Sequence, residues 1–438
     1  MKKYPKYKAS GVDWLGEIPN DWDAIKIKFT DTLIMGQSPE SKDVTDFEKG
    51  LPFLQGNAEF TETHPIPKNW CEKANKLAVK DDLLLSVRAP VGALNVSDQT
   101  YGIGRGLCAI RANKNNLRFL YYILSVSKEE LNKVSTGTTF VAITIPNLSN
   151  VIIPKVNLPE QHTIVRFLDY KTGQIDSFIT NRQKQIELLK EQKQFVLDKR
   201  ITEGIYPEKG FQKIVHPYIK RIPVGWEFKK LAFLSKITRL AGYEYTLLWE
   251  PQEDGEVIAL RGQNVGFNEL KDIENAERIS KELSLRLNRS KLFKGDIVFP
   301  CVGTVGKAVL IEEDNKYHIN QNIAKISPKN EVDGLFLSLL LNSYYAYHQI
   351  IHFNTSDAQP NVLVRDLRRF MIPTPPYEEQ KEIASVIIKE LNTLNTIISK
   401  YQKQIDLMQE YRTSLISQAV TGKIDVREWQ PKMQEYSR

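Results

Sequence analysis

The chain has few cysteines, and their positions exclude the usual cysteine-based sites. Its three cysteines, Cys71, Cys108 and Cys301, are far apart and never form a Cys-x-x-Cys pair. This spacing supports neither a structural zinc site nor a disulfide framework. We therefore expect all of them to be small residues of the hydrophobic core.

Long apolar segments are also missing. No run reaches the roughly 18 apolar residues that a membrane-spanning helix needs, and no apolar stretch follows the lysine-rich residues 1–6 to make a signal peptide. A cytoplasmic location is the default expectation. With 438 residues, 41% of them hydrophobic, the chain is long enough for several globular domains of about 150 residues each.

A strong excess of one charge is absent. Lysine and arginine number 60 and aspartate and glutamate 53, which gives a formal charge of +7 and a pI near 8.9. Such a mild excess permits binding to a polyanion but does not require it.

Catalytic motifs are incomplete. The segment 348–352 has the histidine spacing of a zinc-protease helix, but Gln349 stands where the general base is needed. Gly102 to Gly106 is followed by a strand-like run rather than by a helix that holds phosphate. Thr374-Pro375-Pro376-Tyr377 is similar to a tetrapeptide of amino-methyltransferases, yet no glycine-rich methyl-donor motif accompanies it. We expect a helix entry there, and we predict a non-catalytic chain.

The dominant feature is an internal repeat. The Ile-Pro-x-x-Trp segment at residues 18–22 occurs again at residues 222–226. Residues 154–205 likewise resemble residues 373–424 in sequence. A duplicated unit predicts a pseudo-two-fold molecule that meets a partner twice.

Each half reads as a mixed globular part followed by a long helix. In the first half, short β-branched runs separated by turns predict strands, and only 116–133 looks helical before the long helix. The predicted class is α+β, with two mixed α/β domains joined by two long helices that form an antiparallel coiled coil. The expected boundaries are 1–155 for the first domain, 156–206 for the central helix, 207–374 for the second domain, 375–426 for the C-terminal helix and 427–438 for a poorly ordered or partner-dependent tail.

A heptad rhythm supports the helix pair. The two stretches keep the same phase, and each needs a matching apolar stripe. The alternative is that each helix packs only on its own globular part. The predicted seam consists of Leu168, Ile175, Ile179, Ile186, Leu189 and Val196 in the first helix, and of Ile387, Leu391, Leu394, Ile398, Tyr401, Ile405, Met408 and Leu415 in the second.

Polar and glycine-bearing loops occur at matching places in the two halves. Arginine, glutamine and asparagine side chains read guanine and adenine edges in the major groove, so these loops are candidate DNA contacts. In the first copy the candidates are Gln37, Ser38, Gln55, Asn57, Arg88, Arg105, Thr136 and Thr138. In the second copy they are Arg239, Tyr243, Arg261, Gln263, Asn264, Thr304, Lys307, Asn320, Gln321, Asn322, Ser356, Gln359 and Asn361.

Over essentially its full length the chain resembles the specificity subunits of type I restriction-modification systems. The residues that carry the resemblance are duplicated in order: the two Ile-Pro-x-x-Trp openings, 86–92, 320–322, 153–161 with its echo 372–380, and 415–424. The resemblance implies two target-recognition domains that read a split site in double-stranded DNA. It also implies helices that fix the gap and dock two methyltransferase subunits, with two translocating restriction subunits in the full complex. S-adenosylmethionine, ATP and magnesium would belong to those partners, with no cofactor or metal in this chain.

Sequence differences between the two copies support the interpretation that the chain reads a split DNA site. Gly104-Arg105-Gly106 in the first copy stands where the second has Asn320-Gln321-Asn322, so we expect two unlike half-sites. A specificity subunit of a methylation-only or related system would have the same sequence features. A coiled-coil scaffold with two protein-binding domains is the alternative from another class.

Overall fold

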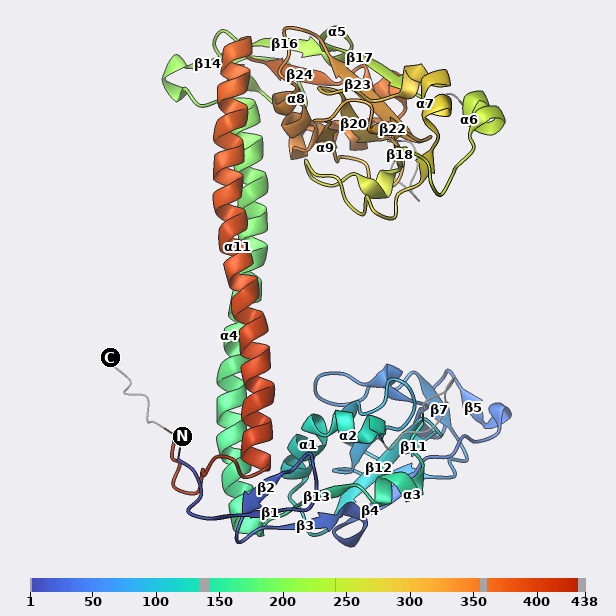
Figure 1. Cartoon of the computed structure of the whole chain (residues 1–438), viewed down its shortest axis with the longest axis vertical. Helices are drawn as coiled ribbons and strands as arrows, with labels where there is room; N and C mark the ends of the chain where they lie inside the picture. The colour runs from blue at the N-terminus through green and yellow to red at the C-terminus, as the bar shows by residue number, and fades with distance from the viewer. Residues whose placement is uncertain (1, 134–141, 241, 355–360, 432–438) are drawn as a thin grey trace. The chain divides into compact units, whose positions relative to one another are not determined.

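The computed structural model describes residues 2–133, 142–240, 242–354 and 361–431 (Figure 1). The chain divides into two compact units. Unit 1 comprises Met1–Arg182 with Lys403–Arg438, and unit 2 comprises Gln183–Gln402. Each long helix therefore contributes one end to each unit. Among the described residues, no helix is both long and apolar enough to span a membrane.

Unit 1 contains two antiparallel strand pairs and two larger sheets. The small pairs are β1 (Tyr7–Ala9) with β2 (Glu17–Pro19), and β3 (Asp23–Lys26) with β13 (Ile152–Lys155). One sheet has the order β10 (Leu94–Val96), β9 (Leu83–Ser86), β12 (Leu107–Ala112) and β4 (Asp31–Met35). The other has the order β5 (Val44–Thr45), β7 (Asn69–Cys71), β6 (Leu51–Leu54), β11 (Tyr101–Ile103) and β8 (Leu77–Ala78), with β6 and β11 parallel.

Unit 2 repeats this plan. Its small pairs are β14 (Phe211–Lys213) with β15 (Arg221–Pro223), and β16 (Glu227–Lys230) with β24 (Met371–Thr374). One sheet has the order β17 (Ser235–Arg239), β23 (Ile323–Pro328), β20 (Ile297–Pro300) and β21 (Val309–Leu310). The other has the order β19 (Arg278–Ile279), β18 (Val257–Leu260) and β22 (Tyr317–Ile319), and here β18 and β22 are the parallel pair.

Helices complete both units, and they include elements that the sequence did not predict. Unit 1 has α1 (Leu117–Val126), α2 (Lys128–Lys133) and α3 (Ile145–Ser149). The expectation of a single helical stretch at 116–133 is therefore wrong, because a further helix begins after the Thr144 N-cap, with Pro146 in its first turn. Unit 2 has α5 (Leu231–Leu234), α6 (Gly242–Leu248), α7 (Lys281–Arg286), α8 (Gly334–Leu341), α9 (Tyr344–Phe353) and α10 (Val364–Leu367). The 3₁₀ turns are Ile27–Phe29, Ser41–Asp43, Asn57–Glu59, Pro207–Lys209, Gly262–Asn264 and Asn288–Ser290.

The two long helices are α4 (Leu158–Glu203) and α11 (Tyr377–Val420). In unit 1, Leu168 and Ile175 of α4 share a core with Leu415 of α11. In unit 2, the other end of α4 packs with the start of α11 through Leu197 and Ile387. The helices therefore run antiparallel as predicted.

Ion pairs join the same two helices. Arg412 donates to Asp176 in unit 1 (2.9 Å), and Arg200 donates to Glu390 in unit 2 (2.7 Å). The alternative in which each helix packs only on its own globular part is therefore wrong.

The structure gives the burial of every residue of the predicted seam. Its members are buried or half-buried throughout. Near the end of α4, however, Val196 is only half-buried, whereas Leu197 and Ile201 are fully buried. A straight α-helix drifts by about 20° per heptad from a seven-residue repeat, so after several heptads the buried face is offset by one residue.

Two further expectations are settled by packing. All three cysteines are buried, as predicted. The tail is not poorly ordered from residue 427 onward: the Trp429 ring lies 5.3 Å from the rings of both Phe167 and Tyr170 on α4. The last seven residues of the predicted tail, 432–438, lie outside the described part of the chain.

Candidate nucleic-acid interface

In unit 2, several of the predicted DNA-contacting loops meet at the carboxyl end of β18. They surround a surface hollow of about 490 Å³, which we call the β18 hollow. The hollow is lined by Tyr245, Arg261, Gly262, Val302, Asn320, Gln321 and Asn322. Segments that are far apart in the sequence thus form one polar surface.

Glu277 organises one wall of the β18 hollow. Its Oε1 accepts a hydrogen bond from Nη2 of Arg261 at 2.8 Å. Its Oε2 accepts one from Nδ2 of Asn320 at 2.6 Å and another from Nε1 of Trp249 at 3.3 Å. The Glu277 side chain is only 14% exposed, whereas that of Arg261 is 50% exposed. No sequence pattern pointed to Glu277, because only the pairing of β18 with its neighbouring strand brings it beside Arg261.

Two predicted base readers are buried, and we reassign them to positioning the loops. Asn264 is 1% exposed: its Oδ1 accepts from the Arg261 amide, and its Nδ2 donates to the carbonyls of Lys271 and Asp272. Asn320 is 2% exposed and donates to Glu277. Their amide groups are used inside the fold, so neither is available to a base edge.

Other predicted side chains face solvent at or near the hollow. Gln321 and Asn322 are exposed at the turn between β22 and β23, and Asn322 has a left-handed φ of +68°. Gln263 is exposed in the 3₁₀ turn after Arg261. Thr304 donates its hydroxyl to the Gly262 carbonyl at 2.8 Å and so ties two of the loops together.

The remaining candidates of unit 2 are more dispersed. Arg239 ends β17 and is half-buried, and Tyr243 is exposed on α6. Asn361 pairs with Val302 of the hollow in an isolated bridge. Lys307 lies with its Nζ 5.9 Å from the Phe267 ring centroid and does not line the hollow. Ser356 and Gln359 fall outside the described residues.

In unit 1, the predicted loops are joined to one another by hydrogen bonds. The Gln37 amide donates to the Ile103 carbonyl at 3.0 Å, and Nε2 of Gln55 donates to the Ser38 hydroxyl at 3.2 Å. The Gly106 amide donates to the Gln55 carbonyl at 3.2 Å. The corresponding surface therefore forms at the end of β6, the counterpart of β18.

Arginines and a glycine complete this surface. Arg88 and Arg105 are exposed on neighbouring loops, and Asn57 is half-buried in a 3₁₀ turn. Gly106 is required by close packing, because a Cβ there would lie 2.5 Å from the backbone carbonyl oxygen of Gln55. Thr136 and Thr138 lie outside the described residues.

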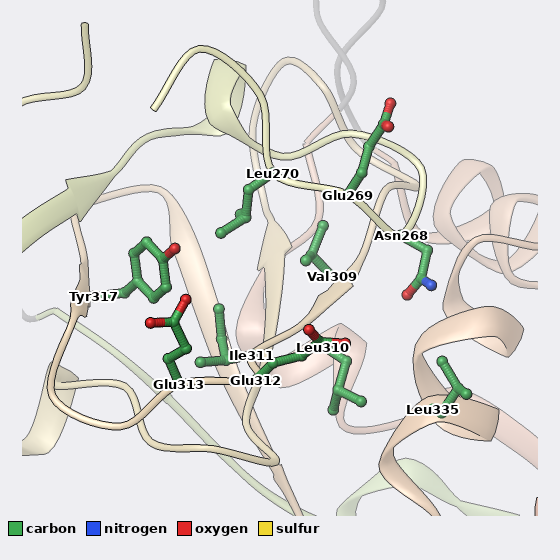
Figure 2. A pocket seen from close by; sticks show the side chains of 10 residues that line it. All are labelled: Asn268, Glu269, Leu270, Val309, Leu310, Ile311, Glu312, Glu313, Tyr317 and Leu335. Atoms are coloured by element: carbon green, nitrogen blue, oxygen red, sulfur yellow. The ribbon is translucent and has the colours of Figure 1, made fainter. Parts of the chain in front are cut away.

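A second hollow of unit 2 has the wrong charge for a nucleic acid. It has a volume of about 240 Å³ and is lined by Asn268, Glu269, Leu270, Val309, Leu310, Ile311, Glu312, Glu313, Tyr317 and Leu335. Figure 2 shows apolar side chains in its middle and carboxylates around them. Those carboxylates repel phosphate.

The residues of the incomplete catalytic motifs, and two of the cysteines, have structural roles. His348 stacks on the Tyr218 ring at 5.4 Å and His352 meets the same ring edge-on at 6.2 Å. Burial raises the pKa of the Cys108 and Cys301 thiols to about 12, so both stay protonated at neutral pH. Residues 374–377 lead into α11, which begins at Tyr377 with Glu378 and Glu379 in its first turn, as predicted.

Comparison with known proteins places both repeats in one family. A family model described as "Type I restriction modification DNA specificity domain" matches residues 19–188 and 223–407. The putative type I restriction enzyme MjaX specificity subunit of Methanocaldococcus jannaschii is 36% identical over 205 residues, which are 46% of this chain and 47% of that protein. In that match the chain covers about half of its relative. The EcoBI specificity subunit of Escherichia coli is 23% identical over 94% of this chain and 88% of its own length.

Solved structures agree on the fold. A chain from a study of complex assembly and conformational transition of the type I R-M system has a TM-score of 0.70 at 16% identity, with 93% of this chain and 99% of that chain covered. The HsdS subunit from Thermoanaerobacter tengcongensis has a TM-score of 0.51 at 16% identity, with coverage of 93% and 98%. Because the family model matches both repeats and most of the sequence, the protein belongs to the family of specificity subunits of type I restriction-modification systems.

Proposed function

We propose that the chain is the non-catalytic subunit that gives a restriction-modification complex its DNA sequence specificity, and that each unit reads one half of a bipartite, asymmetric site. The main support is the pair of equivalent surfaces at the ends of β6 and β18. They have the same strand arrangement but different side chains, with Gln55 in one and Arg261 in the other. Equal frames with unequal side chains favour two different half-sites.

The long helices have a separate role in this proposal. They fix the gap between the half-sites, and they dock two methyltransferase subunits, while two restriction subunits join in the full complex. The continuity of α4 over 46 residues, about 69 Å, and of α11 over 44 residues supports a rigid spacer. S-adenosylmethionine, ATP and magnesium would be bound by the partners.

Methylome sequencing of the host with and without this gene tests the proposal. We expect one two-part motif with a fixed gap to lose its methylation when the gene is deleted. A duplex carrying that motif should then bind the chain together with its methyltransferase partner, and affinity should fall steeply as salt rises. A duplex with one half scrambled is the control. Unchanged methylation after deletion, or binding that is equal for both duplexes, would contradict the proposal.

A further inference from the structure

The pair formed by Arg261 and Glu277 gives the β18 hollow a more specific chemistry. We propose that Arg261 reads a guanine in the half-site of unit 2 and that Glu277 positions it for this contact. This inference rests on the proposed DNA-binding function of the unit. It adds which base is recognised, by which side chain, and what holds that side chain in place.

Glu277 is held firmly enough to act as a support. Asn320 and Trp249 donate to its Oε2, which leaves its Oε1 for Nη2 of Arg261. One edge of the guanidinium is thereby fixed, and the remaining N–H groups belong to a half-exposed side chain at the wall of the hollow. A side chain that is already oriented loses less conformational entropy on binding.

The backbone under Arg261 is held as well. The Arg261 amide donates to Asn264 Oδ1 at 2.9 Å, and the buried Asn264 is bonded to two carbonyls of the neighbouring loop. Arg261 therefore differs from an ordinary surface arginine, because both its main chain and one edge of its side chain have fixed partners.

The chemistry of the pair favours a base over a phosphate. Guanine presents the O6 and N7 acceptors side by side in the major groove, and the planar fork of an arginine matches them. The Glu277 carboxylate offsets the charge of Arg261 at 2.8 Å. This weakens the attraction of Arg261 for a phosphate but leaves the direction of its N–H groups unchanged.

The repeat provides an internal comparison. Strand register makes Leu51 and Cys71 equivalent to Val257 and Ile279. Gln55 and Asn69 of unit 1 therefore stand where unit 2 has Arg261 and Glu277. Gln55 is held by the Ser38 hydroxyl, and a glutamine fits an adenine edge rather than a guanine. At this pair of positions unit 2 therefore has an arginine and a carboxylate, whereas unit 1 has two amides, and the half-site of unit 1 serves as a control.

The test uses the full chain with its methyltransferase partner and a panel of duplexes in which each base pair of the motif is changed in turn. With the wild-type chain, changing one G·C pair in the half-site of unit 2 should weaken binding by about 10- to 100-fold. Arg261→Ala and Arg261→Lys should abolish the preference at that position alone. The lysine keeps the charge but lacks the fork. Preferences in the half-site of unit 1 should not change.

Glu277→Gln tests the positioning role. It keeps the shape of the side chain but loses the charge, and it should reduce discrimination at the same position several-fold without an equal loss on every duplex. Thermal unfolding of this variant checks that the fold is intact. Arg286→Ala is the matched control for Arg261→Ala, because Arg286 is an exposed arginine on α7 that does not line the hollow. Its base preferences should equal those of the wild type.

Two outcomes would overturn the inference. If the Arg261 variants weaken all duplexes equally and lower the salt slope by about one, Arg261 contacts a phosphate. If they change neither affinity nor preference, Arg261 does not contact DNA. Failure of the wild-type complex to distinguish any bipartite motif is a different result, and it would refute the proposed function itself.

Discussion

Gln161 and Gln380 make corresponding hydrogen bonds at the starts of the two long helices. The Oε1 of Gln161 accepts from the Asn116 amide, and the Oε1 of Gln380 accepts from the Asp333 amide. The Nε2 of each also donates to a carbonyl just before its own helix, that of Val156 or Pro375, at 2.8 and 2.9 Å. Asn116 and Asp333 are the N-caps of α1 and α8. Each glutamine therefore ties a long helix to the domain before it.

Removing either glutamine amide should destabilise its unit. Gln161→Leu leaves the Asn116 amide and the Val156 carbonyl without these partners, and each unsatisfied buried group costs about 1–3 kcal/mol. We expect a lower thermal midpoint and faster hydrogen exchange in the peptide that contains Asn116. Gln380→Leu should have the same effect on the peptide that contains Asp333. Gln192→Leu, at an exposed site of α4, is the control. Equal stability of all three variants would show that these bonds are not needed.

The buried ring of His318 should make unit 2 sensitive to mild acid. Burial lowers the pKa of His318, the nearby charges of Lys325 and Lys291 lower it further, and two backbone hydrogen bonds offset these effects only in part. The unfolded ring titrates near pH 6.5. The contribution of neutral His318 to stability is therefore complete above about pH 6.5 and is lost as the pH falls from there toward the lower folded pKa.

Thermal midpoints measured from about pH 7 to about pH 5 check this expectation. The midpoint of His318→Gln should fall less over this range than that of the wild type. His162→Gln changes an exposed histidine on α4 and should follow the wild-type curve. If the thermal midpoint of His318→Gln falls as steeply as that of the wild type, another group causes the acid sensitivity.

Trp429 should stabilise unit 1 although it lies beyond the last helix. Its ring makes an edge contact with Phe167 and a tilted contact with Tyr170. Each aromatic pair contributes about 0.5–1.5 kcal/mol beyond its buried area, so Trp429→Ala should cost about 1–3 kcal/mol. Thermal unfolding of the full chain measures the effect. Tyr411→Ala, which removes an exposed ring from α11, should change the midpoint little, and an equal effect of both variants would contradict the docking of Trp429.

The sequence was most informative where a short-range pattern determines the structure. The heptad positions predicted α4, α11 and their pairing, because burial follows helical periodicity. The same rule missed Leu197, since the drift between seven residues and two helical turns accumulates along α4. The Trp429 contact was missed because it depends on a helix that is far away in the sequence.

The candidate interface was predictable as a set of loops but not as individual contacts. Arg261 and Gln321 are exposed at the β18 hollow, whereas Asn264 and Asn320 have the same chemistry and point into the fold. Strand register determines whether such a side chain is exposed at the hollow or buried in the fold. Glu277 was missed for the same reason, because it meets Arg261 only through the pairing of β18 with β19.

If the helices set the gap between half-sites, lengthening both should lengthen the gap. One heptad inserted after Arg182 in α4 and one after Gln402 in α11 would preserve the phase of the buried seam. Seven residues add about 10 Å, which equals about three base pairs at about 3.4 Å each. We expect methylome sequencing to show the same two half-sites with a gap longer by about three base pairs.

A heptad inserted into α4 alone is the informative control. It leaves α11 without matching length, so the seam on one side of the insertion loses its register, and we expect lower stability and lost methylation rather than a new gap. The paired insertion restores the match because both helices grow by the same two turns. Altered half-sites with an unchanged gap in the paired variant would mean that the loops, and not the helices, determine the spacing. A longer gap with intact half-sites would mean that α4 and α11 set the spacing between the half-sites, and that loops such as the one that carries Arg261 read the bases.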